Sequence, residues 1–381
     1  MAPPPRHFAP VHSAPLAPAA CGASRAGQDS PRPSPGRILT VQRWLTINAG
    51  LGAASLAVCT VSLLFGATRV EMGAVIEALR DSMAAGTFDP ATMNSSALIL
   101  VHIRLPRVLA GFLVGGSLAA VGVSLQALLR NALADPYVLG VSSGAALGVS
   151  LAMWFGIGTT LALIPALPVF GFLGGVLSLV AMYRLAQSQE RLPVQSLLLA
   201  GVILNAILTA VIMFITSIME PNRSAGLMAW LMGSLAAPDY AVLASFACYS
   251  AVGMALLLRL TPELNILTLG EGVARSLGVE TERVKKQLFV VTALLTGSVV
   301  SISGMIGFVG MVVPHAVRMM IGSDHRLLLP VSALVGGMFL VLSDTVARTI
   351  LAPTEIPVGI VTAIAGGPFF LYLLLRRKDR M

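Results

Sequence analysis

The sequence has 381 residues, of which 56% are hydrophobic and only 11% are charged, and its mean hydropathy is +0.85. Soluble domains carry about 25% charged residues, so this composition excludes an ordinary soluble domain and predicts a polytopic membrane protein. In so apolar a chain, the net charge of +8 indicates arginine-rich cytoplasmic loops rather than a surface that binds nucleic acid. The three cysteines have no metal-binding or redox spacing and are interpreted as small apolar filler.

Residues 1–40 differ from the rest, because they are rich in proline and alanine and show no apolar periodicity. Such a segment cannot bury a core, so a disordered cytoplasmic tail is predicted. A signal peptide does not fit, because the first apolar run begins only near Trp44 and is long enough to span a membrane. A start codon assigned too far upstream is the alternative.

Ten apolar runs follow, and we interpret them as membrane spans. The second contains many small residues, including Gly111, Gly115 and Gly122, which allow neighbouring helices to approach closely. The eighth is short and glycine-rich, as is typical of a half-helix or a re-entrant segment. The predicted spans are 44–66, 104–129, 138–158, 167–186, 193–218, 240–260, 284–304, 307–321, 327–350 and 356–375. The predicted fold is therefore an all-α polytopic membrane protein whose ten-span transmembrane domain covers residues 41–381.

Lysine and arginine residues set the predicted orientation, because cytoplasmic loops carry an excess of them. Threading ten spans from a cytoplasmic N-terminus leaves 19 of the 25 on the cytoplasmic side. The outer side holds Arg69, Arg80, Arg104, Arg107, Arg223 and Arg348. Both termini are therefore expected on the cytoplasmic side of the membrane.

Charged residues within the predicted spans are few. Asp344 lies near the outer end of the ninth span, four residues before Arg348, and an i, i+4 ion pair is its simplest structural role. Carriers driven by protons or sodium need buried carboxylates along their path, because a charge in the membrane is costly and is kept for function. Their near-absence argues against an ion-coupled secondary transporter, which is the alternative from another class.

Residues 261–283 form a hydrophilic segment between the sixth and seventh spans. Gly270 and Gly278 are expected to break it into two short helices, the second braced by an i, i+4 pair of Glu271 and Arg275. Apolar residues such as Leu269 lie among few charges, and an apolar face in water usually has a partner that buries it. An ordinary surface loop is the alternative.

Two motifs bear on catalysis. Gly140–Gly144 matches G-x-S-x-G with Ser142 as nucleophile, but that motif needs a strand–turn–helix and here it begins a membrane helix. A membrane-embedded hydrolase is therefore only a third hypothesis. No G-x-x-x-x-G-K-[ST] phosphate loop is present, so any ATP hydrolysis must take place on a partner. The histidines form no i, i+4 metal pair, and neither a metal site nor a cofactor is predicted.

Several blocks of sequence resemble the permeases of cobalamin and iron-siderophore importers, the FecCD/BtuC-type family of type II ABC importers. The resemblance covers about residues 44–380 and leaves only the N-terminal tail outside. Its blocks are RLPR (104–107), QALLRNALADPYVL (126–139), SLLLAG (196–201), WLMGS (230–234), LGEGVAR (269–275), GMIGFVGMVVPHAVR (304–318), DHRLLLP (324–330) and IPVG (356–359).

This resemblance implies a type II ABC importer permease fold with ten transmembrane helices and a homodimer with one path on its two-fold axis. It also implies two cytosolic ATPase subunits and a periplasmic substrate-binding protein as partners, in the inner membrane of a bacterium. Membrane lipid is a further expected partner, and nucleic acid is not. The predicted function is import of an iron(III) chelate, either a ferric siderophore or haem, driven by ATP hydrolysis on the partner. Cobalamin is the close alternative.

The resemblance also assigns roles to residues. The arginines that receive glutamates of the binding protein are Arg104, Arg107 and Arg348. The residues that couple to the ATPase are Leu267, Leu269, Gly270, Glu271, Arg275, Leu277 and Gly278, with the three leucines inserting into a groove on it. The cytoplasmic gate is formed by Asn131, Leu133, Val194 and Gln195, although Val194 departs from the small polar residue of the family.

Overall fold

The computed structural model describes residues 40–66, 94–157, 164–187 and 192–378, with isolated positions at 68, 73, 76, 80, 160 and 161. Residues 1–39 of the expected tail lie outside the described residues. The described chain is helical apart from one short antiparallel pair of strands, β1 (Thr160–Leu161) and β2 (Ile164–Pro165). The predicted all-α fold is therefore confirmed.

Ten apolar helical segments of the described chain correspond one to one to the predicted spans. Those long and apolar enough to cross a membrane are α1 (Val41–Leu64), the continuous run Ser95–Leu128, α6 (Ala166–Ala186), α7 (Val194–Ile218), α9 (Tyr240–Arg259), α12 (Thr281–Ser303) and α14 (His325–Thr349). The shorter ones are α5 (Val141–Trp154), α13 (Val309–Ile321) and α15 (Val358–Lys378).

The central helix is α4 (Leu105–Leu128), which is buried along most of its length and packs against α14 and α13. Its glycines allow this packing. A Cβ atom at Gly115 would lie 2.3 Å from the Gly336 carbonyl oxygen of α14, and one at Gly122 would lie 1.7 Å from the Gly310 carbonyl oxygen of α13. The small residues of the second span therefore permit close helix contacts, as the sequence predicts.

Three local features differ from the sequence expectation. The second span begins earlier than residue 104, because α3 (Ser95–Leu98), capped by Asn94, and the π-helical turn η1 (Ile99–Arg104) run directly into α4. The third span is shorter, because the 3₁₀ turn η2 (Pro136–Leu139) and Gly140, at φ 74°, precede α5. A short helix not expected from hydropathy, α8 (Pro221–Leu231), follows α7.

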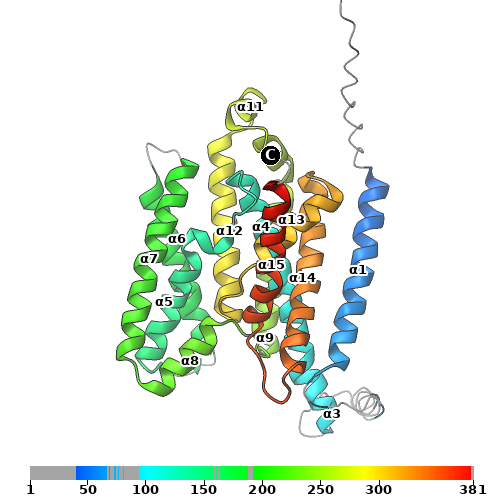
Figure 1. The fold of residues 1–381 in the computed structure, drawn as a ribbon, viewed down its shortest axis with the longest axis vertical. Coiled ribbons are helices and arrows are strands. Elements are labelled where there is room, and N and C mark those ends of the chain that lie inside the picture. Colours follow the sequence, from blue (N-terminus) through cyan, green and yellow to red (C-terminus); the bar gives the residue numbers. More distant parts are fainter. Residues whose placement is uncertain are drawn as a thin grey trace, which may run out of the picture. The chain divides into compact units, whose positions relative to one another are not determined.

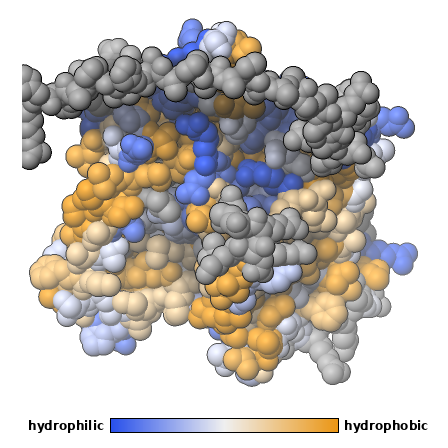
Figure 2. Space-filling model, turned by 45° about the horizontal axis from the view of Figure 1, so that its top comes forward, coloured by the Kyte–Doolittle hydropathy of each residue, from blue (hydrophilic) through white to orange (hydrophobic). Residues whose placement is uncertain are grey.

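The two ends of the bundle carry different elements (Figure 1). One end, called the α11 end, holds α10 (Thr261–Leu267), α11 (Glu271–Ser276) and the C-terminal part of α15. The opposite end, called the α3 end, holds α3, α8 and the C-termini of α1 and α14. Figure 2 shows hydrophilic residues gathered over the middle of the α11 end and apolar residues along the flanks. This distribution suits a bundle whose flanks face lipid.

Candidate functional site

Arg107, near the α3 end of α4, forms the centre of a buried ion cluster. Its Nε donates to both carboxylate oxygens of Asp344 at 3.1 Å, and its Nη2 donates to Asp344 Oδ1 at 2.9 Å. Its Nη1 donates to Glu355 Oε2 at 2.9 Å. Asp344 belongs to α14, so this pair ties α4 to α14 with the forked geometry that arginine makes with carboxylates.

Arg104 and Arg348 both donate hydrogen bonds to the last turn of α1. Arg104 Nη1 lies 2.8 Å from the Leu63 carbonyl oxygen, and Arg348 Nη2 lies 2.7 Å from the Ser62 carbonyl oxygen. The final carbonyls of a helix lack partners within the helix and carry partial negative charge, so guanidinium groups stabilise this end. Arg348 Nε also lies 3.7 Å from Asp344 Oδ2, which confirms the predicted i, i+4 pair.

The three arginines with a predicted docking role are thus gathered at the α3 end, with all three side chains buried. Their guanidinium groups hold carboxylates and carbonyls of this same chain. The side chain of Glu355 is 49% exposed, so it is the part of this cluster that is most open to solvent. Sequence reasoning missed the Arg107–Asp344 pair and Glu355, because their positions lie 237 and 248 residues from Arg107 along the chain.

The segment 261–283 folds as the sequence predicts, into the two short helices α10 and α11. Gly270 and Gly278 separate and end them with φ of 119° and 82°, conformations that side-chain-bearing residues rarely adopt. The predicted pair is present on α11, where Arg275 Nη2 lies 3.6 Å from Glu271 Oε2. Two leucines of the segment are open to solvent, Leu269 at 65% and Leu277 at 60% exposed.

The expectation that Leu267 inserts into a partner is wrong, because its side chain is only 2% exposed. Leu264 and Leu267 are three residues apart on α10, so both point from one face into the bundle. Leu269 follows the last turn of α10 and does not lie on that buried face. The apolar character of the leucines does not distinguish Leu267, which is buried in the bundle, from Leu269 and Leu277, which are exposed.

A buried lysine joins α11 to the beginning of α7. Lys285 Nζ on α12 lies 2.7 Å from Glu282 Oε1 and 3.4 Å from Glu271 Oε1, and it donates to the Leu192 carbonyl oxygen at 3.1 Å. Glu282 Oε2 in turn accepts from the Leu192 backbone N–H at 2.9 Å. Leu192 is two residues before Val194, so this network, called the Lys285 junction, ties the 261–283 segment to one of the predicted gate positions.

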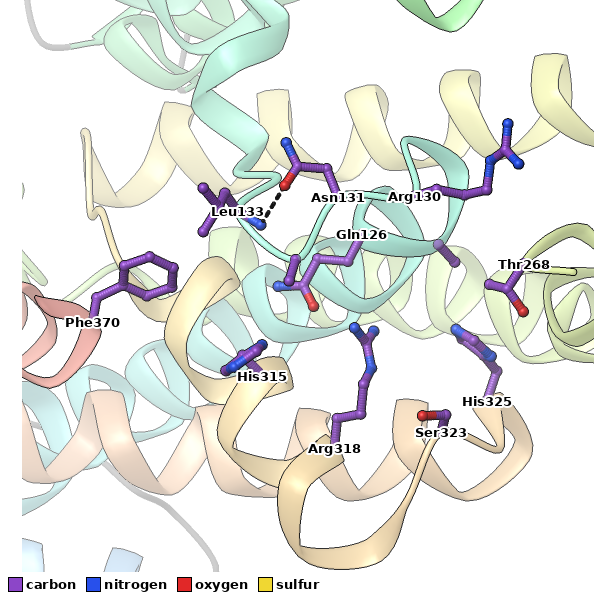
Figure 3. A pocket seen from close by; sticks show the side chains of 12 residues that line it. Gln126, Arg130, Asn131, Leu133, Thr268, His315, Arg318, Ser323, His325 and Phe370 are labelled. Carbon is purple, nitrogen blue, oxygen red and sulfur yellow. Dashed lines mark hydrogen bonds between the residues drawn. The ribbon is translucent and has the colours of Figure 1, made fainter. Parts of the chain in front are cut away.

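The other predicted gate residues, Asn131 and Leu133, line a cavity of about 580 Å³ at the α11 end. Asn131 Oδ1 accepts from the Leu133 backbone N–H at 2.9 Å, which fixes this turn (Figure 3). Val194 is half-buried and Gln195 exposed at the start of α7, and neither lines this cavity. Within one chain, the two predicted gate segments are therefore not brought to one cavity.

Ser142 is buried in the first turn of α5, in a helix rather than a strand–turn–helix elbow. Within the described residues, no group of three His, Cys, Asp or Glu side chains could hold a metal ion.

Comparisons with known proteins agree with this architecture. Residues 54–376 match the model of the FecCD transport family. The cobalamin import system permease protein BtuC of Halobacterium salinarum is 43% identical over 75% of this chain and 76% of its own length. The hemin transport system permease protein HmuU of Yersinia pestis is 40% identical over 77% of this chain and 88% of its own length. A solved inward-facing structure, described as a metal-chelate type ABC transporter, superposes with a TM-score of 0.73 at 30% identity, covering 87% of this chain and 99% of that one.

Proposed function

Because this chain belongs to the FecCD transport family, we propose that it carries an iron(III) chelate, such as a ferric siderophore or haem, across the bacterial inner membrane. The family match and the relatives make it a multi-span permease of an ABC importer for metal chelates, haem or cobalamin. The match over residues 54–376, on ten apolar segments, is the observation that carries the proposal. Cobalamin is the second candidate, supported by the 43% identity to a cobalamin permease.

The proposed assembly has two copies of this chain, two cytosolic ATPase subunits and a periplasmic binding protein. An ATPase partner is required by this reading, because the sequence contains no phosphate loop of its own. The α11 end faces the cytoplasm in this proposal, together with both termini, because most lysines and arginines then lie inside. The α3 end then faces the periplasm and the binding protein.

The proposed docking site for the binding protein is the cluster of Arg104, Arg107 and Arg348. Since Arg107 already holds the exposed Glu355, a carboxylate of the binding protein would replace Glu355 on Arg107 rather than meet a free guanidinium. Arg104 and Arg348 hold backbone carbonyls of α1. Docking at this cluster would therefore act on the position of α1 relative to α4 and α14.

The proposed contact with the ATPase is the exposed face of the 261–283 segment, with Leu269 and Leu277 inserting and Glu271 and Arg275 bracing α11. Its support is the exposure of both leucines beside a well-anchored α10. The proposed gate is the Asn131–Leu133 turn of each copy with Val194 and Gln195. In a homodimer, these segments from two chains can meet even though one chain keeps them apart.

Reconstitution into proteoliposomes with the ATPase and the binding protein tests this function. ATP supplied on the ATPase side is expected to drive uptake of haem or a ferric siderophore, and omission of the binding protein is expected to stop it. Uptake of cobalamin alone would select the second candidate. Uptake that follows membrane potential and persists without the ATPase would contradict the ABC importer assignment altogether.

A further inference from the structure

The cavity at the α11 end has a polar and basic lining. It is lined by residues of α4, α13 and α15, by Ser323 and His325 at the start of α14, and by Thr268 beside α10. Its positively charged or titratable lining residues are Arg130, His315, Arg318 and His325, and no carboxylate is among the lining residues. An anion is therefore the ligand that this lining favours.

Arg318 is the arginine that points into this cavity, whereas the exposed Arg130 side chain points away from it (Figure 3). The half-buried guanidinium of Arg318 reaches from α13 toward Gln126 of α4, with the His325 ring nearby (Figure 3). Within the described part of the chain, no hydrogen bond or ion pair holds the Arg318 guanidinium. A guanidinium that is partly removed from water without a counter-charge is costly, and its planar fork suits a carboxylate or phosphate.

Two hydrogen-bond acceptors without partners lie beside it, both on side chains that are 2% exposed. Gln126 Nε2 donates to the Met311 carbonyl oxygen at 3.1 Å, and this leaves its buried Oε1 with no partner among the described residues. The Nε2 atom of His325 is also buried and unpartnered there. Buried polar atoms are normally hydrogen-bonded, so both point to a group that supplies hydrogens.

The tautomer of His325 is set by a relay from Asp324. The Asp324 carboxylate can only accept, so Asn265 turns its Nδ2 toward Asp324 Oδ1 at 2.8 Å. The Asn265 Oδ1 then lies 2.7 Å from His325 Nδ1, which must carry the hydrogen of that bond. In the neutral ring, Nε2 is therefore an acceptor. The same relay engages the carboxylate of Asp324, which is not among the residues that line the cavity.

We propose that this cavity binds a small organic anion that also carries a hydroxyl group, with an α-hydroxycarboxylate as the representative ligand. The carboxylate would pair with Arg318, and the hydroxyl would donate to Gln126 Oε1 or His325 Nε2. The volume of about 580 Å³ is that of a small-molecule site rather than of a single water. A plain carboxylate or a phosphodiester supplies no hydrogen for the two acceptors, which is why the hydroxyl belongs to the proposal.

The cavity lies at the α11 end, between the predicted gate turn and the proposed contact with the ATPase. Asn131 and Leu133 line it on one side, and Thr268 precedes the exposed Leu269 on the other. That the ligand comes from the cytoplasm rests on the proposed function, because only that function orients the α11 end. Binding itself does not depend on orientation, and it can be measured on the permease without its partners.

The test uses the purified full chain in neutral detergent and citrate as the probe. Isothermal titration is expected to show saturable citrate binding. Tricarballylate, which has the same three carboxylates without the hydroxyl, is expected to bind several-fold more weakly. Arg318→Gln is expected to weaken citrate binding about tenfold or more, because it removes a charge-assisted contact. Arg326→Gln, an exposed arginine outside the cavity lining, is the matched control and should bind citrate like the wild type.

Two further variants keep the result interpretable. Arg318→Lys retains the charge without the fork and is expected to bind citrate with intermediate affinity. This variant serves as the comparison with the wild type if Arg318→Gln folds poorly. Gln126→Leu removes one acceptor and is expected to reduce the preference for citrate over tricarballylate. Absence of citrate binding by folded wild-type protein would overturn the proposal and leave the cavity to water. Equal losses in Arg318→Gln and Arg326→Gln would do the same by showing non-specific attraction.

A lipid headgroup is the other source of an anion near a membrane surface. Nanodiscs that contain phosphatidylglycerol or only phosphatidylcholine separate the two. Citrate binding of similar strength in both supports the soluble ligand. Displacement of citrate by phosphatidylglycerol in the wild type would overturn the soluble ligand and assign the site to lipid. Because no ATPase or binding protein is present, neither outcome is affected by failure of the transport function.

Discussion

At the residue scale, the guanidinium of Arg107 is shared between a buried carboxylate and an exposed one. Breaking an exposed ion pair costs about 0–1 kcal/mol, whereas removing one partner of a buried pair costs about 3–5 kcal/mol. Glu355 can therefore leave Arg107 easily and Asp344 cannot. If a carboxylate of the binding protein replaces Glu355, Glu355→Gln should tighten docking several-fold, measured by surface plasmon resonance of the purified permease.

The matched control for this prediction is Glu220→Gln. Glu220 is also an exposed acid at the α3 end, but it pairs with Arg223, at 3.4 Å, and not with the cluster. Its substitution should leave docking unchanged. Docking should also weaken as salt rises, because charged contacts at the rim of an interface are screened. An unaltered affinity in Glu355→Gln would mean that Arg107 does not receive the binding protein.

Asp135, in the turn between α4 and η2, leads to a prediction of how the stability of the protein depends on pH. Burial raises the pKa of its carboxyl from 3.8 to about 6, although the hydrogen bond from the Tyr137 N–H opposes the rise. The folded state thus holds this proton more tightly than the unfolded chain. The contribution to stability is full below pH 3.8 and is lost as the pH rises through 6.

Asp135→Asn keeps an oxygen for the Tyr137 N–H and removes the titration. We expect it to be more stable than the wild type at pH 7, by at most about 3 kcal/mol, with the difference shrinking toward pH 4. Thermal unfolding in detergent across this range measures it. Parallel pH profiles for the two proteins would contradict the raised pKa.

At the element scale, α10 packs into the bundle through the buried Leu267, while the exposed Leu269 follows it in the chain. Leu269→Asp changes an exposed side chain, so the permease should keep its unfolding temperature while the ATPase no longer co-purifies. Leu267→Ala empties a buried position, so it should destabilise the permease by about 2–5 kcal/mol while the ATPase still binds to the folded fraction. A Leu269→Asp complex that purifies intact and transports normally would exclude this segment as the contact.

The same scale shows what the sequence could and could not predict. The early start of the second span, at the Asn94 N-cap of α3, was missed. The spans themselves were predictable because lipid requires long apolar helices. Helix α8 was not, because it is too short and polar to give a hydropathy signal. Leu267 was misplaced because its burial depends on where α10 sits against α4 and α14, a tertiary contact that local periodicity does not contain.

At the scale of the whole molecule, the arginine cluster at the α3 end and the cavity at the α11 end are both assembled from distant parts of the chain. The Arg107–Asp344 pair joins α4 to α14, and the cavity at the α11 end draws side chains from four helices and three connecting segments. Motif matching found the Arg104–Arg107 block and the DHR block around His325. It could not predict that Arg318, Gln126 and His325 face one cavity, because that follows from the packing of α4 against α13 and α14.

The Lys285 junction connects the proposed ATPase contact with the proposed gate. Lys285 is buried and joins Glu271 of α11 to the Leu192 carbonyl, two residues before α7 begins. A displacement of α11 by the ATPase would therefore be transmitted to Val194 through a charged contact. Coupling of this kind needs an element that both sites move, so it must be tested by response at one site to a change at the other.

Lys285→Gln supplies that test. It removes the charge that binds Glu271 and Glu282, so we expect the ATPase to remain bound while transport per ATP hydrolysed falls. The direct readout is a cysteine at position 194, whose labelling by a maleimide should change with nucleotide in the wild-type background and not in Lys285→Gln. Arg283→Gln is the matched control, because its exposed side chain pairs with Glu280, at 3.6 Å on the surface, and with no other acid among the residues that the structure describes. A nucleotide response at position 194 that survives Lys285→Gln unchanged would rule out the junction as the link between α11 and α7.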